Sequence, residues 1–208
     1  QLSKLSAAQV GAIGTNQIQS LTTTQAAALT VAQAAGLSTA QIATMETADV
    51  AKLSTAVIAG LSTAQAAALT ADQVAGLSTD QLSKLSAAQL GAIGTSQIQA
   101  LTTAQAGALT ATQAAGLTTA QISKLESDDL AKLSTSVIAG LSGTQVGAMT
   151  GQQVADLTTT QASALTGTQV GGLTTAQIAA METADLAKLS TSASQSLTTR
   201  QMDALTAG

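Results

Sequence analysis

Apolar residues recur at every eighth position along the chain. Counted from Leu5 as the first position of a unit, Leu, Ile or Met occupies that position in an unbroken series that ends at Leu205. The series defines 25 complete units of eight residues, which we call octads. A second apolar column stands at the sixth position, where Val, Ile, Leu, Met or Ala is found in nearly every octad. A fixed period of this kind is the signature of a repeat protein.

The polar positions predict one short helix in each octad. Ser or Thr follows the first position in 20 octads, and Gln stands at the fifth position in 19. Ser6 and Gln9 have the spacing of a capping box, in which the N-cap hydroxyl and the later Gln side chain each accept a hydrogen bond from the other residue's backbone amide. This capping role accounts for the Gln column, although Gln could also form hydrogen bonds between adjacent units.

Glycines and charges in the same frame mark the end of each helix. We expect the glycines at the eighth position to adopt the left-handed conformation that terminates many helices. These residues are Gly36, Gly60, Gly76, Gly116, Gly140 and Gly172. All six Lys stand at the eighth position, and nine of the eleven acidic residues stand at positions two to five, with Asp156 and Asp203 as the exceptions. The helix dipole favours acids at the start of a helix and bases at its end.

The period of eight decides between three architectures. Along one continuous helix the apolar stripe would rotate by about 80° per octad, so no single face would be apolar. A β-solenoid remains an alternative, because side chains alternate along a strand and an even period of eight would keep all first-position residues on one face. However, Ala and Gln, which dominate here, are poor strand formers. The pattern favours an all-α solenoid of very short helices, one per octad, and it leaves the number of octads per turn open. Helices this short need burial against neighbouring octads to be stable.

A longer repeat overlies the octads. Residues 1–9 recur at 81–89, and the octad 45–52 recurs at 125–132 and, after a further shift of 56 residues, at 181–188. Both shifts are multiples of eight, so the octad is the structural unit. No Pro-rich or charged linker interrupts the chain, which predicts a single continuous array over residues 1–208. Because the array starts and stops within an octad, we expect it to be a window of a longer periodic chain or filament.

The composition removes whole classes of chemistry from consideration. The chain has no Cys, His, Pro, Trp, Tyr or Phe, its charged residues are 9%, and its net charge is −4. Without His or Cys, zinc sites and Ser-His-Asp triads are not expected, and without aromatic residues bases have no stacking platform. Seven scattered basic residues form no phosphate-binding patch. We therefore expect no catalysis, no cofactor, no nucleic acid, no small-molecule substrate and no membrane span.

Three octads with Glu and Asp three residues apart are the clusters that most resemble a site. Carboxylates of this kind can bind Ca²⁺, but each octad offers few ligands and no loop of the EF-hand type. The candidate metal ligands are Glu46, Asp49, Glu126, Asp129, Glu182 and Asp185, with Asp128 beside them. We interpret these octads instead as a charged variant of the capping box, with Glu at the N-cap. No metal site is then predicted, and EDTA should leave the melting temperature nearly unchanged.

The run Leu101-Thr102-Thr103-Ala104-Gln105-Ala106-Gly107-Ala108-Leu109 and its neighbours resemble the octad-rich stretches of very large bacterial surface proteins. These are repetitive adhesin-like chains, often labelled haem-utilisation or adhesion proteins. The resemblance covers the full chain and carries over no binding residue. It implies an extracellular or cell-surface location and a structural role as a stalk or filament. Self-association of the chain is expected separately, because an uncapped solenoid can stack end to end. The alternative is a binding solenoid that presents Thr to ice or carries glycans.

Overall fold

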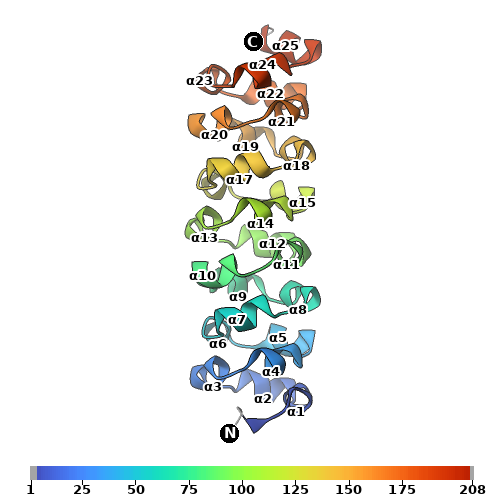
Figure 1. Ribbon diagram of the computed structural model, residues 1–208, viewed down its shortest axis with the longest axis vertical. Helices are drawn as coiled ribbons and strands as arrows, with labels where there is room; N and C mark the ends of the chain where they lie inside the picture. Colours follow the sequence, from blue (N-terminus) through green and yellow to red (C-terminus); the bar gives the residue numbers. More distant parts are fainter. Residues whose placement is uncertain (1–3, 207–208) are drawn as a thin grey trace. The chain divides into compact units, whose positions relative to one another are not determined.

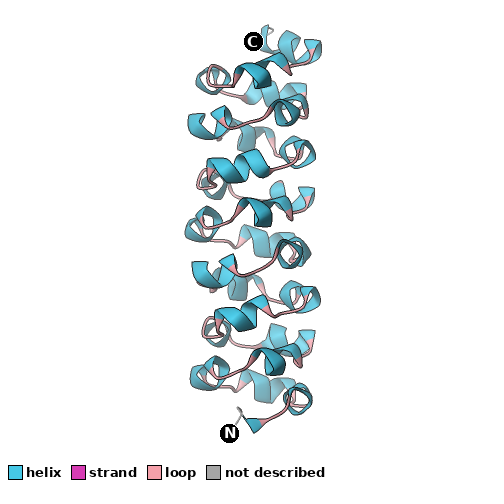
Figure 2. Cartoon of the chain, in the orientation of Figure 1, coloured by secondary structure: helices cyan, strands magenta, loops and turns pink. Residues whose placement is uncertain are grey.

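Helices form in octad after octad of the chain. The computed structural model describes residues 4–206, and within that range every regular element is an α-helix and no strand occurs (Figure 2). The all-α solenoid predicted from the octads is therefore confirmed, and the β-solenoid alternative is wrong. The helices are very short: most have four to six residues, and α25 has eight.

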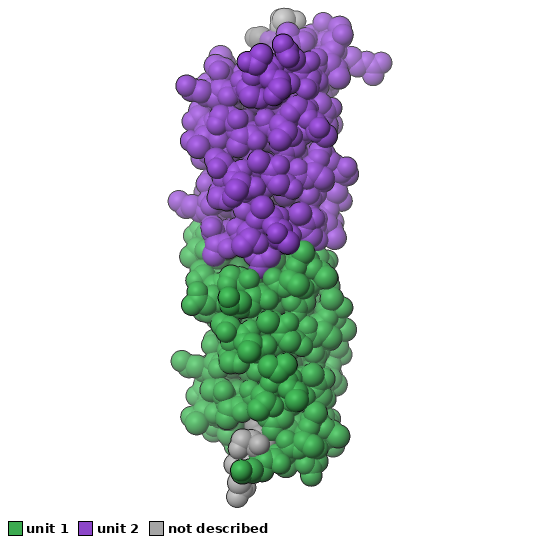
Figure 3. Space-filling model, in the orientation of Figure 1, with its two compact units in different colours: residues 1–105 green, residues 106–208 purple. Residues whose placement is uncertain are grey.

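The chain divides into two compact units, residues 1–105 and residues 106–208 (Figure 3). The helices of the first unit, labelled in Figure 1, are α1 (Ala7–Gly11), α2 (Thr15–Gln19), α3 (Thr23–Ala27), α4 (Val31–Ala35), α5 (Thr39–Thr44), α6 (Thr47–Val50), α7 (Thr55–Ala59), α8 (Thr63–Ala67), α9 (Ala71–Ala75), α10 (Thr79–Ser83), α11 (Ala87–Ala92) and α12 (Thr95–Gln99). Helix α13 (Thr103–Gly107) includes the point of division. The helices of the second unit are α14 (Ala111–Ala115), α15 (Thr119–Ile122), α16 (Ser127–Leu130), α17 (Thr135–Gly140), α18 (Gly143–Gly147), α19 (Gly151–Ala155), α20 (Thr159–Ser163), α21 (Gly167–Gly171), α22 (Thr175–Ala180), α23 (Thr183–Leu186), α24 (Thr191–Gln195) and α25 (Thr199–Thr206).

The predicted capping boxes start most of the helices. Ser6 accepts a hydrogen bond from the backbone amide of Gln9, and the Gln9 side chain accepts one from the amide of Ser6. The same reciprocal pair forms at Thr22 with Gln25. Each N-cap has an extended backbone, as at Ser6 with φ −70° and ψ 163°, so the helix of the preceding octad cannot continue through it. The chain therefore turns once in every octad.

The helix ends differ from the prediction made for glycine. No residue in the described range has a positive φ, so the left-handed ending expected at the eighth position is wrong. Gly36 and Gly76 lie in the right-handed region, and Gly140 is the last residue of α17. The physical reason for glycine is space: a Cβ on Gly76 would lie 2.6 Å from the Thr47 methyl group, and one on Gly36 would collide with the Ala7 carbonyl oxygen.

Within each unit, every turn of the solenoid packs on the turn before it. Helices three apart in chain order are in contact, as α8 with α11 in the first unit and α14 with α17 in the second. Hydrogen bonds from Gln side chains reach backbone carbonyls 28 and 31 residues earlier, as from Gln73 to Met45 and Ile42. A turn thus takes between three and four octads, a number that the sequence left open. Most of the first- and sixth-position residues, such as Met45 and Ile42, are buried and form the core of each unit.

Gln at the fifth position joins each turn to the one before it. The Oε1 atom of Gln73 accepts from the Thr70 amide at 2.8 Å, and its Nε2 atom donates to the carbonyls of Ile42 at 2.9 Å and Met45 at 2.7 Å. We call the series of these inter-turn bonds the Gln ladder. Its members include Gln33, Gln41, Gln65, Gln73, Gln81, Gln89, Gln97, Gln105, Gln145, Gln153, Gln161, Gln169, Gln177 and Gln201. The Gln hydrogen bond between octads, which the sequence analysis treats as secondary to capping, is thus a regular feature of the fold.

Candidate functional site

Three octads place a buried aspartate where the Gln ladder has its glutamine. Asp49 in α6, Asp129 in α16 and Asp185 in α23 are 1%, 3% and 1% exposed. The Oδ2 atom of each is buried without a hydrogen-bond partner. An ionised Asp is shorter than Gln and has no donor, so it cannot make the inter-turn bonds of the amide that it replaces. A buried polar atom without a partner costs stability, which makes these three positions the candidate site.

The glutamates of the same octads start their helices without capping them. Glu46, Glu126 and Glu182 stand at the N-caps of α6, α16 and α23, as the sequence predicted. None of the three side chains makes a capping hydrogen bond, so the charged capping box is wrong. All three side chains are exposed. A carboxylate that folded back over the helix start would approach the carboxyl of the Asp three residues later, and repulsion between like charges disfavours that position.

Burial and neighbouring charge change the acidity of the three aspartates. Burial raises the pKa of the Asp49 carboxyl above 3.8, and the negative charge of Glu46 raises it further. The pKa of Asp185 is raised by burial and then by the charge of Glu182. The same two causes raise the pKa of Asp129, with Glu126 as the nearby charge and a further contribution from Asp128. Each site therefore favours a neutral carboxylic acid, which can donate a hydrogen bond, or a carboxylate with a cation beside it.

The structure pairs each predicted glutamate with its aspartate but does not assemble a larger cluster of ligands. Between residues 4 and 206, no group of three or more acidic residues lies close enough to hold one metal ion directly. The sequence-based expectation that no metal is required therefore stays a prediction, to be tested by treatment with EDTA. Sequence reasoning treated the inter-turn bond of Gln as secondary to its capping role. That bond explains why an Asp at this position is left with an unpartnered oxygen.

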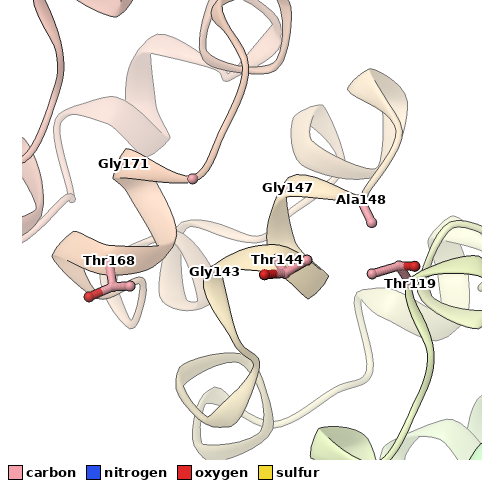
Figure 4. A pocket seen from close by; sticks show the side chains of 8 residues that line it. Thr119, Gly143, Thr144, Gly147, Ala148, Thr168 and Gly171 are labelled. Atoms are coloured by element: carbon pink, nitrogen blue, oxygen red, sulfur yellow. The ribbon is translucent and has the colours of Figure 1, made fainter.

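A shallow depression in the second unit was not expected from the sequence. It encloses about 700 Å³ and lies along α15, α18 and α21 (Figure 4). Its lining consists of threonines and small residues: Thr119, Gly143, Thr144, Gly147, Ala148, Thr168, Gly171 and Gly172. A Cβ on Gly147 would lie 2.7 Å from the Gly172 carbonyl oxygen, so the backbones here approach more closely than larger residues allow. Glycines at the third and seventh positions are the signal that could have located it.

Short helices wound into turns and joined by a ladder of glutamines define a helical repeat protein of the solenoid class. Four segments, residues 42–79, 74–111, 122–159 and 178–208, match the model of the ALTTAQ repeat, and together they cover more than half of the chain. The protein belongs to the ALTTAQ repeat family, and Ala100–Gln105 spells the repeat letter for letter. A comparison with curated proteins finds no match. Within the described residues, no helix is both long and apolar enough to cross a membrane.

Proposed function

We propose that this chain is a non-catalytic structural scaffold that works outside the cell, as part of a stalk or filament. The observation that carries the proposal is the Gln ladder. The same amide makes the same pair of inter-turn bonds in octad after octad, from Gln41 in the first unit to Gln201 in the second. The polar residue that recurs most regularly therefore holds turns together.

Growth by whole octads suits a protein that provides length. In each unit a helix packs on the helix three octads away, so an added octad repeats contacts that already exist. The internal shifts of 80 and 56 residues are of this kind. The partner that we propose is a further copy of the same repeat, because an array with one repeated surface presents the same contacts many times.

Two measurements on native material test this proposal. Antibodies against the chain should label intact cells of the producing organism, and mild external protease should remove the label. Sedimentation of the purified protein should show larger species as its concentration rises. Label that appears only after permeabilisation would contradict the extracellular location. A monomer at every concentration, with one native band of about the mass of this chain, 20.2 kDa, would contradict the filament or stalk role.

A binding solenoid is the alternative, and the Thr-lined depression of the second unit is the observation that favours it. Thr119, Thr144 and Thr168 line it from the three helices α15, α18 and α21 (Figure 4). Threonine hydroxyls on a face of small residues can bind ordered water or carry glycans. An ice-recrystallisation assay distinguishes this alternative: inhibition that is lost in Thr144→Val would favour it. Absence of inhibition at high protein concentration would remove the ice-binding form of the alternative.

A further inference from the structure

The octads that lack Gln at the fifth position occur in adjacent pairs. Gln stands there in 19 of the 25 octads. The remaining octads form three pairs, each with Asp in the first octad and an apolar residue in the second: Asp49 with Val57, Asp129 with Val137, and Asp185 with Ala193. We call the segments 45–60, 125–140 and 181–196 the gap pairs. Each gap pair omits the Gln of the ladder twice in succession, over about half of a turn.

In the first unit, the gap pair interrupts the bonds to the turn before it. Gln41 precedes the gap pair and donates to the carbonyl of Ile13 at 2.7 Å. Gln65 follows it and donates to the carbonyl of Ala34 at 2.8 Å. Among the described residues, no bond of the ladder reaches the stretch 14–33 between these two acceptors. Helices α6 and α7 therefore contact α3 and α4 without the support of the ladder.

The turn after the gap pair keeps its bonds to it. Gln81 donates to the carbonyl of Leu53 at 2.8 Å, and Gln89 donates to that of Ala59 at 3.3 Å. The segment 45–60 is thus joined by the ladder on one side only.

The helix starts within the gap pair are also weaker than those around it. Glu46 makes no capping hydrogen bond, and Ser54 accepts from the amide of Val57 without a Gln to complete the box. Helices α8, α9 and α10, which follow in the same unit, all begin with complete capping boxes. Asp49 adds a buried Oδ2 atom without a partner. Missing caps, missing inter-turn bonds and an unsatisfied polar atom therefore coincide in one segment.

We propose that the gap pairs are opening points built into the solenoid. At each of them, two short helices separate from the turn before while the octads around them stay folded. A helix of about one turn depends on its neighbours for stability, so the free energy of local opening is lowest where the bonds to a neighbour are missing. The buried Val57 keeps the segment closed for most of the time. This inference goes beyond the scaffold role and does not rest on it, because opening is a property of the isolated chain.

Two lysines with matched surroundings allow a test with trypsin. Lys52 lies in the first gap pair and Lys84 lies in an octad of the ladder. Both are exposed, both stand at the eighth position, and both are followed by Leu and Ser. Trypsin cuts a chain that has opened locally, so at low trypsin concentration the rate of cutting reports the population of the open form. At neutral pH the full chain should be cut after Lys52 at least about tenfold faster than after Lys84.

The double variant Asp49→Gln/Val57→Gln restores the ladder across the gap pair. The register of the neighbouring Gln41 and Gln65 aims both new amides at carbonyls 28 and 31 residues earlier. Cutting after Lys52 should then slow to about the rate at Lys84. The control Asp72→Gln also exchanges an acid for an amide, but at an exposed position outside the ladder, and it should leave both rates unchanged. Circular dichroism must show that both variants are as helical as the native chain.

Hydrogen exchange of the native chain supplies a second readout that needs no variant. Helix α6 contacts α3 before it and α9 after it, and α9 contacts α6 and α12, so each has neighbours on both sides. Exchange corrected for intrinsic rates should nevertheless be faster in residues 45–60 than in residues 61–76. Three results would overturn the proposal. They are equal exchange in these two segments, equal cutting after Lys52 and Lys84, and a folded double variant that slows both cuts equally or neither.

Discussion

At the scale of single residues, the fifth position of the octad decides how well two turns are joined. A Gln there satisfies a backbone amide of its own helix start and two carbonyls of the turn before, as Gln73 does. Val57 replaces Gln with an apolar side chain that is itself buried. Asp49 puts a charge-bearing group in the same place and leaves Oδ2 without a partner. The three residues therefore form a series. Gln73 is a polar side chain with hydrogen-bond partners, Val57 is apolar and needs none, and Asp49 is polar with an oxygen that has no partner.

Removal of one inter-turn amide should cost more than removal of a capping amide alone. In Gln73→Ala, the carbonyls of Ile42 and Met45 both lose the bond from the amide, although Ile42 keeps the bond from the Met45 backbone amide. We expect the free energy of unfolding to fall by about 2–3 kcal/mol. The side chain of Gln25 is exposed, and among residues 4–206 its hydrogen bonds are those with Thr22 in the capping box, so Gln25→Ala should cost about 0.5–1 kcal/mol. Urea denaturation of the two variants measures both values. Equal losses would show that the inter-turn bonds contribute nothing beyond the cap.

The buried aspartates make stability depend on pH in a defined direction. Since the pKa of Asp49 is raised in the folded chain, its contribution to stability is full below about pH 3.8 and is lost as the pH rises through the raised value. Asp49→Asn carries no charge and keeps a donor. It should therefore be more stable than the native chain at pH 7, and the difference should shrink as the pH falls towards 4.

A control for the pH experiment lies three octads away. Asp72 is exposed in α9, so Asp72→Asn removes a charge without removing a buried one. Its stability difference from the native chain should change little over the pH range in which that of Asp49→Asn shrinks. Urea midpoints measured between pH 4 and 7 supply the comparison. A difference for Asp49→Asn that does not vary with pH would contradict the burial of an ionisable carboxyl at this position.

At the scale of the element, the octad is a helix of about one turn with its own start signal. Such a helix has no stability in isolation, and in most octads it buries its first- and sixth-position residues in the core of its unit. The sequence predicted the start of each helix and both buried columns, because a cap and a core position depend on neighbours within one octad. The capping box of Ser6 and Gln9 is an example of a predicted helix start, and the buried residues Ile42 and Met45 are examples of predicted core positions.

Features that depend on how turns are staggered could not be read from one octad. The need for glycine at position 36 follows from the approach of Ala7 in the turn before, 29 residues earlier in the sequence. It does not follow from the backbone conformation, which Ala28 shares at the end of α3. The second bond of Gln73 likewise depends on the length of a turn. A period of eight sets the helix but leaves the number of octads per turn open, so these partners were not predictable.

Substitutions of glycine separate close approach from helix propensity. A Cβ on Gly172 would lie 2.8 Å from the Gly143 carbonyl oxygen, and a backbone atom cannot move away as the tip of a side chain can. We expect Gly172→Ala to lower the free energy of unfolding by about 1–3 kcal/mol. At Gly151 in α19 the nearest atom would be the Ala180 Cβ at 3.9 Å, so Gly151→Ala should be neutral or stabilising by up to about 1 kcal/mol. Thermal melting of both variants measures these effects. A higher melting temperature for Gly172→Ala than for the native chain would contradict the close contact with Gly143.

At the scale of the molecule, each compact unit is held together by contacts between residues at similar separations in the sequence. Helices contact those three octads away, and the Gln ladder spans 28 to 31 residues, as from Gln153 to Leu125 and Ile122. A globular domain of similar size joins residues at many separations, so a local defect weakens the whole. In a solenoid the stability is close to a sum of octads and their nearest interfaces, and a defect stays near its origin.

Hydrogen exchange measured on Gln153→Ala tests this locality within the second unit. Loss of the two inter-turn bonds should speed exchange in peptides that cover residues 150–157 and 119–125, which contain the donor and its acceptors. Helix α22 contacts α19 directly and should show a smaller increase, and α25, which contacts α22 in turn, should show little or none. The native chain under the same conditions is the reference. An equal increase in every peptide of residues 106–206 would mean that the unit opens only as a whole, and the description of its stability as a sum of local interfaces would then be wrong.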